Sequence, residues 1–317
     1  MRQLYRLEPA RYAPHALHSS DRSFTETNCY TDVWIELLHG AGLDPTAVMG
    51  YCIAIDFEGD QFTFFKPPAH DIERLYGIEI QELTVYRPLH EHAIEQLERG
   101  CTILPEVDAW FLPDTAATSY GAEHVKTSIA IEAVDLDART LRYFHNAGYH
   151  ELRDEDFDGI FQVGEHSAGM FRMPPFTELL RIDKRRVLTD HELRTVSREL
   201  LAHHLARRPA ANPIDLFAVR LAADLERLLS ADEADYHAYT FATVRQLGAA
   251  FELAASHLDW LGEPAAAAAC RELTDGAKML LFKLVRAANR RRPFDVREAA
   301  APLAASWTRA MSALDSS

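Results

Sequence analysis

The stretch Thr27–Gly40 reads TNCYTDVWIELLHG and predicts a short helix with a cysteine at its beginning. Apolar side chains recur at helical spacing from Val33 onward, and Gly40 is a natural place for the helix to end. Asn28 is a good N-cap, so Cys29 falls in the first turn, where free backbone N–H groups and the helix dipole favour a thiolate. A packed cysteine can occupy the same position, so the rest of the chain has to distinguish a nucleophile from a core residue.

The composition is that of an ordinary globular protein. Its 317 residues are 48% apolar and 26% charged, which is enough for one large domain or two smaller ones. The formal net charge of −15 argues against general nucleic-acid binding, although it is compatible with a small basic patch.

The chain carries no signal for export or for membrane insertion. No segment approaches the ~18 uninterrupted apolar residues of a membrane helix, and the first residues have no signal-peptide core. The cysteines are scattered in a way that is typical of reduced thiols. They are Cys29, Cys52, Cys101 and Cys270. We therefore expect a cytoplasmic protein without a membrane partner.

The chain divides into two parts of different character. Residues 1–175 mix strand-like runs with two or three helices, whereas residues 176–317 lose nearly all strand signals and are rich in Ala, Leu and Arg. The sequence therefore predicts an α+β domain followed by an α-helical bundle, joined near Met173–Phe176. Thr189 and Asn212 are expected to cap the first two of about five helices in the bundle.

Turn residues and apolar periodicity give the elements of the first part. The expected elements are a hairpin of residues 51–57 and 61–66, a helix over 71–76, a strand over 78–86, a helix over 89–99, a strand over 101–112 with Pro105 at an edge or bulge, and a hairpin of residues 124–134 and 140–146.

The last hairpin supplies partners for Cys29. His124 begins its first strand and Asn146 ends its second, and an antiparallel hairpin brings these two ends together. A cysteine at a helix N-terminus, a histidine as its base and an Asn or Asp that orients the histidine form a nucleophile arrangement suited to acyl transfer. A bulge or twist is needed for Asn146 to reach His124, and Asp108 is the alternative orienting residue.

These segments carry a resemblance to a known family. They are Asn28-Cys29 with the helix to Gly40, residues 71–78 (DIERLYGI), residues 100–113 (GCTILPEVDAWFLP), His124 with its strand, and residues 143–146 (YFHN). The stretch from Cys29 to Phe161 resembles the papain-like N-terminal domain of butirosin-type aminoacyltransferases. It also resembles an uncharacterised bacterial family of similar length with a helical C-terminal half.

The resemblance implies a papain-like domain in which Cys29 takes an acyl or aminoacyl group from the phosphopantetheine arm of a carrier protein. His124 would be its base. Asn146 stands where that family typically has an acid, and Asn28 and Asp108 are candidates for an oxyanion or orienting role. The acceptor would be a small-molecule amine, and the enzyme would need no cofactor of its own. The alternatives are a non-catalytic protein that binds an acylated carrier protein, and a cysteine peptidase or amidase.

Two basic runs are candidates for docking an acidic carrier protein. They are Lys184-Arg185-Arg186, just after the expected joint, and Arg290-Arg291-Arg292, near the end of a long helix. Screening limits long-range repulsion from the acidic chain to about 8 Å at physiological ionic strength, so a local basic cluster can dominate a contact. The other interpretation is that both runs are solvated helix ends.

One metal-binding pattern occurs. Residues 154–165 satisfy the EF-hand calcium-loop pattern, but the flanking segments do not favour two helices, and we expect Asp154 to cap a short helix instead. His90 and His92 lie one residue apart and are expected at the surface, so no metal site is predicted. Motifs of α/β-hydrolases, P-loops and dinucleotide-binding folds are absent from the sequence.

Overall fold

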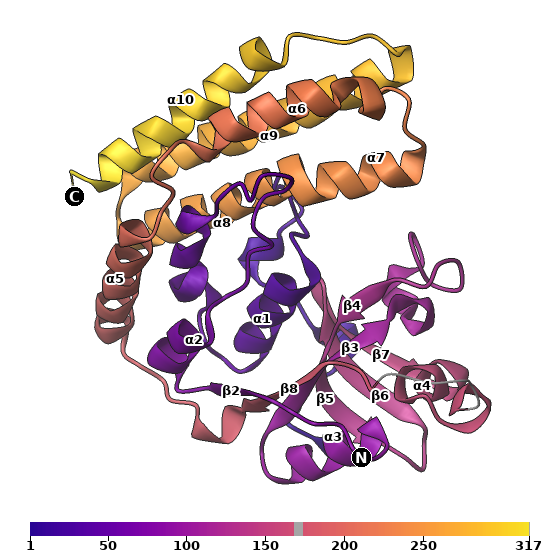
Figure 1. Ribbon diagram of the computed structural model, residues 1–317. Helices are drawn as coiled ribbons and strands as arrows, with labels where there is room; N and C mark the ends of the chain where they lie inside the picture. The colour runs from indigo at the N-terminus through magenta and orange to yellow at the C-terminus, as the bar shows by residue number, and fades with distance from the viewer. Residues whose placement is uncertain (168–173, 317) are drawn as a thin grey trace. The chain divides into compact units, whose positions relative to one another are not determined.

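The computed structural model describes residues 1–167 and 174–316 (Figure 1). It is a mixed α+β structure with two four-stranded antiparallel sheets and a helical C-terminal part. Its internal contacts divide the chain into two compact units. The α/β unit comprises Met1–His18, Asn28–Pro45 and Pro68–Leu188, and the helical unit comprises Ser19–Thr27, Thr46–Pro67 and Thr189–Ser317.

The first sheet of the α/β unit has the strand order β1-β5-β6-β7. Its strands are β1 (Arg2–Gln3), β5 (Ala130–Asp135), β6 (Thr140–His145) and β7 (Gly148–Arg153). The predicted last hairpin is confirmed for β5 and β6, with Asp135 opposite Thr140 and an irregularity between Ile131 and Ala133.

The second sheet has the order β2-β8-β3-β4. Its strands are β2 (Glu79–Glu82), β8 (Thr177–Arg181), β3 (Thr102–Asp108) and β4 (Lys126–Ser128). Of the two predicted alternatives at Pro105, an edge or a bulge, the edge is wrong, because β3 pairs with β8 as far as Pro105 and with β4 from Glu106 onward. Pro105 therefore lies where β3 exchanges one neighbour for the other, and its carbonyl still accepts a hydrogen bond from the Ile129 N–H at 3.2 Å.

Helices of the α/β unit follow the sequence closely. They are α1 (Cys29–Gly40), α2 (Ala69–Tyr76), α3 (Leu89–Glu98) and α4 (Asp154–Phe161). Short 3₁₀ turns cover Pro9–Arg11, Ala16–His18, Ala109–Phe111, Pro113–Thr115, Gly164–Ser167 and Ile182–Lys184. Because α2 ends at Gly77 with a φ of 72°, a glycine is needed there.

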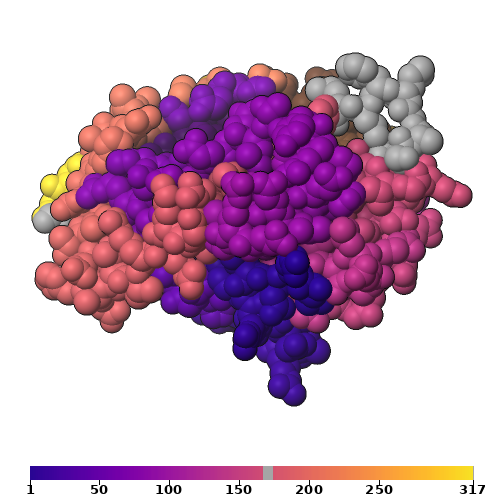
Figure 2. Space-filling view, turned by 90° about the horizontal axis from the view of Figure 1, so that it is seen from below, coloured from indigo at the N-terminus to yellow at the C-terminus, as the bar shows by residue number. Residues whose placement is uncertain are grey.

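The segment before α1 is fixed to that helix by a buried charge cluster. The first residues of the chain are exposed and lie at the surface (indigo, Figure 2), whereas His18 is buried. Its Nε2 lies 3.3 Å from Asp32 Oδ1, and its Nδ1 contacts Glu36. Both carboxylates belong to α1, so the helix that begins at Cys29 is held by an imidazole from the preceding segment.

The helical unit contains the predicted bundle. Its elements are α5 (Asp190–Ala206), α6 (Pro213–Leu228), α7 (Glu233–Thr240), a π-helical turn (Phe241–Arg245), α8 (Gln246–Leu261), α9 (Pro264–Arg290) and α10 (Val296–Leu314), orange to yellow in Figure 1. Thr189 caps α5 and Asn212 caps α6, as predicted. The π turn joins α7 to α8.

Two early segments of the chain, Ser19–Thr27 and Thr46–Pro67, also belong to the helical unit, and the second contains the predicted first hairpin. The predicted hairpin of residues 51–57 and 61–66 is largely wrong, because Pro45–Ala54 forms 3₁₀ turns and a single bridge joins Phe57 to Phe62. These two rings pack against Phe217 of α6, with centroid distances of 5.6 and 5.4 Å. The apolar pattern that predicts strands therefore serves packing against helices.

The boundary between the parts lies later than the sequence indicates. Because β8 pairs with β2 and β3, residues after 175 still belong to the α/β unit, which extends to Leu188. Met173 of the predicted joint lies outside the described residues.

Candidate active site

Cys29 is the first residue of α1, as the sequence predicts. Asn28 is extended, and its side-chain oxygen accepts a hydrogen bond from the Thr31 N–H at 3.0 Å, so it caps the helix. Cys29 is half-buried, and its Sγ lies 4.0 Å from the Ser128 Oγ of β4. The thiol therefore combines a capped helix N-terminus with partial access to solvent.

The face of the second sheet that meets Cys29 is polar. Glu106 of β3 lies opposite Ser128, and Asp108 lies opposite Lys126. Alternate residues of a strand share a face, so these four side chains lie on the face that Ser128 presents to Cys29. The Lys126 Nζ lies 2.9 Å from Glu106 Oε1. The thiol thus faces a surface that also carries paired charges.

His124 is paired with Asp108. Its Nδ1 lies 2.6 Å from Asp108 Oδ2, and its ring stacks on Trp110 at a centroid distance of 4.5 Å. Asp108 also accepts a hydrogen bond from the Trp110 N–H at 3.1 Å, which fixes the carboxylate. The His124 side chain is 69% exposed, so the other ring nitrogen is accessible. Among the two predicted orienting residues, Asp108 is the one that bonds His124.

The imidazole and the thiol each have a different partner: Asp108 for His124 and Ser128 for Cys29. His124 lies before β4 begins, and its ring bonds Asp108, which lies opposite Lys126. No hydrogen bond joins Cys29 to His124 in the described part of the chain. The Ser128 hydroxyl is thus the side chain that the structure places beside the thiol, and the pairing of Cys29 with His124 stays a prediction.

Asn146 lies in the turn between β6 and β7, with a φ of 46°. The predicted strand over 124–134 divides at Ile129, because β4 joins the second sheet and β5 joins the first. The hairpin pairing therefore stops at Ala130 opposite Phe144, and no hydrogen bond between the described residues connects Asn146 with His124.

Sequence reasoning missed the histidine that does reach β4. The His145 Nε2 lies 2.8 Å from Thr127 Oγ1, and its Nδ1 lies 2.6 Å from Asp114 Oδ2. Burial alone would raise the pKa of Asp114, but the hydrogen bond and charge of His145 lower it below its usual value. His145 is buried, with 1% of its side chain exposed, so this Thr-His-Asp chain joins β4 to β6 away from solvent. Its only sequence signal is its place beside Asn146.

A pocket of about 750 Å³ opens where β3 ends and β4 begins. His124, Asp108, Lys126 and the carboxylates of Glu82 and Glu106 line it together with apolar side chains. Three acids therefore face one lysine and one histidine, which favours a cationic ligand.

Comparisons with protein families cover nearly the whole chain. The DUF1839 N-terminal domain matches residues 13–182, and the DUF1839 C-terminal domain matches residues 190–316. The chain belongs to the DUF1839 family. No curated protein matches the sequence. A family of unknown function with a helical C-terminal domain agrees with one of the two resemblances noted in the sequence, and the aminoacyltransferase resemblance stays a prediction.

The two basic runs of this DUF1839 protein lie in different units. Lys184 forms an ion pair of 2.5 Å with Glu79, and Arg186 donates a hydrogen bond to the Arg74 carbonyl. These two cations therefore support β2 and the end of α2. The run Arg290–Arg292 is exposed where α9 ends, and Arg291 adopts a left-handed conformation there.

The described residues of this DUF1839 protein contain no group of three or more His, Cys, Asp or Glu arranged for a metal. The EF-hand pattern forms α4, a helix rather than a loop, with Arg153 at the cap position that we expected Asp154 to hold. Asp156 accepts a hydrogen bond from Tyr120, and Asp158 pairs with Arg139. His92, expected at the surface, is buried against Tyr86. No helix in the described part of the chain is both long and apolar enough to span a bilayer.

Proposed function

We propose that this protein is an acyl or aminoacyl transferase in which a papain-like α/β unit uses Cys29 to take an acyl group from a thioester. The observation that supports this proposal is the half-buried thiol at the capped start of α1, on the polar sheet face that also carries the His124–Asp108 pair. The donor that we propose, from the resemblance to carrier-dependent aminoacyltransferases, is the phosphopantetheine thioester of a carrier protein.

In the first step, the Cys29 thiolate attacks the carbonyl carbon of the donor thioester. A bond forms between that carbon and Sγ, the bond to the donor sulfur breaks, and the donor leaves as a thiol after taking up the proton that Cys29 released. Backbone N–H groups at the beginning of α1 stabilise the negative charge that develops during the attack.

In the second step, an amine attacks the acylated Cys29. His124, oriented by Asp108, takes the proton from the amine as the C–N bond forms and the C–S bond breaks. Because His124 bonds Asp108 and its side chain is exposed, it is available to the acceptor amine. The excess of acids in the neighbouring pocket suits an amine.

Mass spectrometry with a pantetheine thioester tests both steps. The parent protein should gain the mass of one acyl group, and Cys29→Ala should gain none. His124→Gln should still be acylated but should pass the group to an amine roughly 100-fold more slowly. His70→Gln, another exposed histidine of the α/β unit, is the control and should behave as the parent. An absence of adduct on the parent would refute the transferase.

The hydroxyl of Ser128 beside the thiol favours a second candidate, a protein that binds an acylated carrier without reacting with it. This candidate predicts equal binding of the acylated carrier by the parent and by Cys29→Ala, with no adduct on either. Hydrolysis without an acceptor amine would indicate a hydrolase instead.

A further inference from the structure

One side of α9 in the helical unit is both apolar and basic. Its exposed residues, here called the α9 face, are Lys278, Met279, Phe282, Lys283, Val285 and Arg286. Met279 is 57%, Phe282 58% and Val285 42% exposed, although each is large and apolar. Neighbouring apolar side chains of this size on one helix are typical of a surface that another molecule covers.

The charge of the α9 face is opposite to that of the whole chain. No acid occurs between Asp275 and Asp295 in a chain with a net charge of −15. Lys278 and Arg286 lie one turn to either side of Phe282 on the same stripe of the helix. Neither they nor Lys283 form an ion pair with any residue that the structure describes. These cations are therefore available to an acidic partner.

A pocket of about 490 Å³ adjoins the face. Lys278 and Phe282 line one part of it, Arg245 another, and the segment Ser23–Glu26 the remainder. A single apolar side chain projecting from a partner would fit such a hollow between cations. A flat bilayer surface would leave it empty, so the pocket favours a protein over a membrane.

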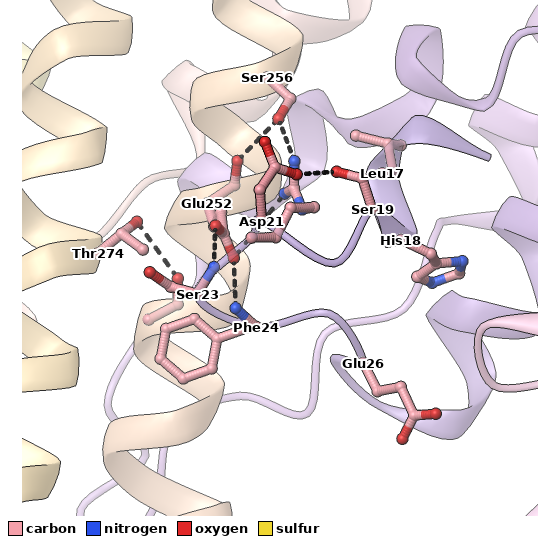
Figure 3. Close-up of polar contacts among 12 residues, drawn as sticks. Leu17, His18, Ser19, Asp21, Ser23, Phe24, Glu26, Glu252, Ser256 and Thr274 are labelled. Carbon is pink, nitrogen blue, oxygen red and sulfur yellow. Dashed lines mark hydrogen bonds and ion pairs between the residues drawn. The ribbon is translucent and has the colours of Figure 1, made fainter. Parts of the chain in front are cut away.

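The segment that lines the pocket is fixed in place. The backbone N–H groups of Ser23 and Phe24 each donate to the Glu252 carboxylate of α8, both at 2.8 Å (Figure 3). Arg22 donates to Ser256 Oγ at 3.0 Å. The Phe24 ring packs so tightly on Gly248 that a Cβ there would lie 2.5 Å from it. The pocket is therefore a formed feature of the helical unit.

Chain connectivity limits the distance from this pocket to the thiol. Glu26 precedes Cys29 by three positions, so their Cα atoms are at most about 11 Å apart, whatever the arrangement of the units. The part of the pocket lining that Glu26 forms is consequently joined to the thiol by a short length of chain.

We propose that the α9 face and its pocket bind an acidic protein that carries the acyl thioester, with an apolar side chain of that protein in the pocket. The acyl cargo rests on the proposed function, whereas the acidic partner rests on the unpaired cations and exposed apolar side chains of α9. Arg290 continues the face by one turn, and the run Lys184–Arg186 lies in the other unit and has no part in it.

The binding test uses the full chain with Cys29→Ala and an acetylated acyl carrier protein as the probe. The double variant Lys278→Glu/Arg286→Glu should weaken binding roughly tenfold or more, and Phe282→Ala should weaken it as well. The matched controls are Arg207→Glu/Arg297→Glu, with the same charge change at exposed unpaired arginines of the same unit, and Leu216→Ala, an apolar side chain 50% exposed on α6. Both controls should bind as the parent does.

The acylation test uses two donors and parent Cys29. The double variant should accept acetyl from the carrier protein at least roughly tenfold more slowly, and acetyl from N-acetylcysteamine at the parent rate. If the variant accepts acetyl from the carrier protein as fast as the parent does, the proposed docking surface is wrong. It is also wrong if the small thioester acylates the parent but the parent does not bind the carrier protein. If the parent binds phosphatidylglycerol vesicles and the double variant does not, while both bind the carrier protein equally, the α9 face would be a membrane-binding surface. Carrier binding that depends on Lys278 and Arg286 without any adduct would refute the transferase alone.

Discussion

The position of Ser128 next to the Cys29 thiol changes the roles that we expect for the site residues. In a nucleophile–base pair the imidazole bonds the thiol directly. Here the Ser128 hydroxyl lies 4.0 Å from the sulfur, and the His124 imidazole bonds Asp108 at the end of β3. The helix N-terminus and the Ser128 hydroxyl are then the groups beside the thiol, and His124 remains free to act on a second substrate.

Selective alkylation checks the access to Cys29. The other three cysteines are buried: burial raises the pKa of the Cys101 and Cys52 thiols, and raises that of Cys270 to about 12. Brief treatment with iodoacetamide at neutral pH should therefore label Cys29 first, as read by peptide mass spectrometry. Cys29→Ser should remove this early label. Labelling of the buried cysteines at a similar rate would contradict the prediction.

His18 should make the stability of the protein depend on alkaline pH. Burial alone would lower the pKa of His18, but hydrogen bonds and charges from Asp32 and Glu36 raise it to about 9. The folded value thus exceeds the unfolded value of about 6.5, so the stabilisation is complete below pH ~6.5 and is lost as the pH rises through ~9. The loss amounts to roughly 3 kcal/mol, since one pKa unit corresponds to about 1.4 kcal/mol.

Urea unfolding at pH 6.5 and 9.5 measures this effect. The free energy of unfolding of the parent should fall by more than that of His18→Gln, in which the neutral amide does not titrate. Equal losses in the two proteins would assign the pH dependence to other groups.

At the scale of elements, the sequence predicts helices better than sheets. Asn28, Thr189 and Asn212 act on their own helix ends, and each is a cap in the structure. Strand pairing depends on distant segments, so the division at Ile129 and the inner position of Pro105 could not be read locally. The predicted meeting of His124 and Asn146 depends on the same pairing, and it stays a prediction.

The end of α2 offers a test of a glycine that is fixed by its neighbours. Gly77→Ala should lower the free energy of unfolding by about 1 kcal/mol because of the left-handed conformation. It should lower it by about 1–3 kcal/mol more because of crowding, since the new Cβ would lie 2.8 Å from the Lys184 carbonyl. Gly42→Ala has the same positive φ but no atom within 4 Å, so it should cost only the first amount. Chemical unfolding of both variants gives the difference, and equal costs would show that Lys184 moves aside freely.

At the scale of the whole molecule, the chain enters the helical unit twice and returns each time to the α/β unit before the bundle begins. Loss of strand signals after 175 predicts a simple succession of domains, but Ser19–Thr27 and Thr46–Pro67 belong to the helical unit. Ser19–Thr27 has one large apolar residue, Phe24, whereas Thr46–Pro67 is rich in them, and a sequence pattern does not state which distant helices they cover. Site residues on local elements, such as Cys29 with its cap, were therefore predictable, whereas the pocket beside α9 was not.

The C-terminal bundle should consequently not fold by itself. A fragment of residues 189–317 lacks Phe57 and Phe62, whose rings pack on Phe217, and Phe24, which covers Gly248. It also lacks the Thr46 carbonyl that lies 2.8 Å from the His257 Nδ1. Burying an aromatic side chain contributes about 1.5–3 kcal/mol, so three missing rings remove an amount comparable to the stability of a small domain.

We expect the fragment to show helical circular dichroism without a cooperative thermal transition, and to bind a hydrophobic dye. The full chain is the reference, since it supplies the missing segments within the same molecule. A fragment with a sharp transition at the melting temperature of the full chain would contradict the prediction. It would mean that the bundle core is stable without Ser19–Thr27 and Thr46–Pro67.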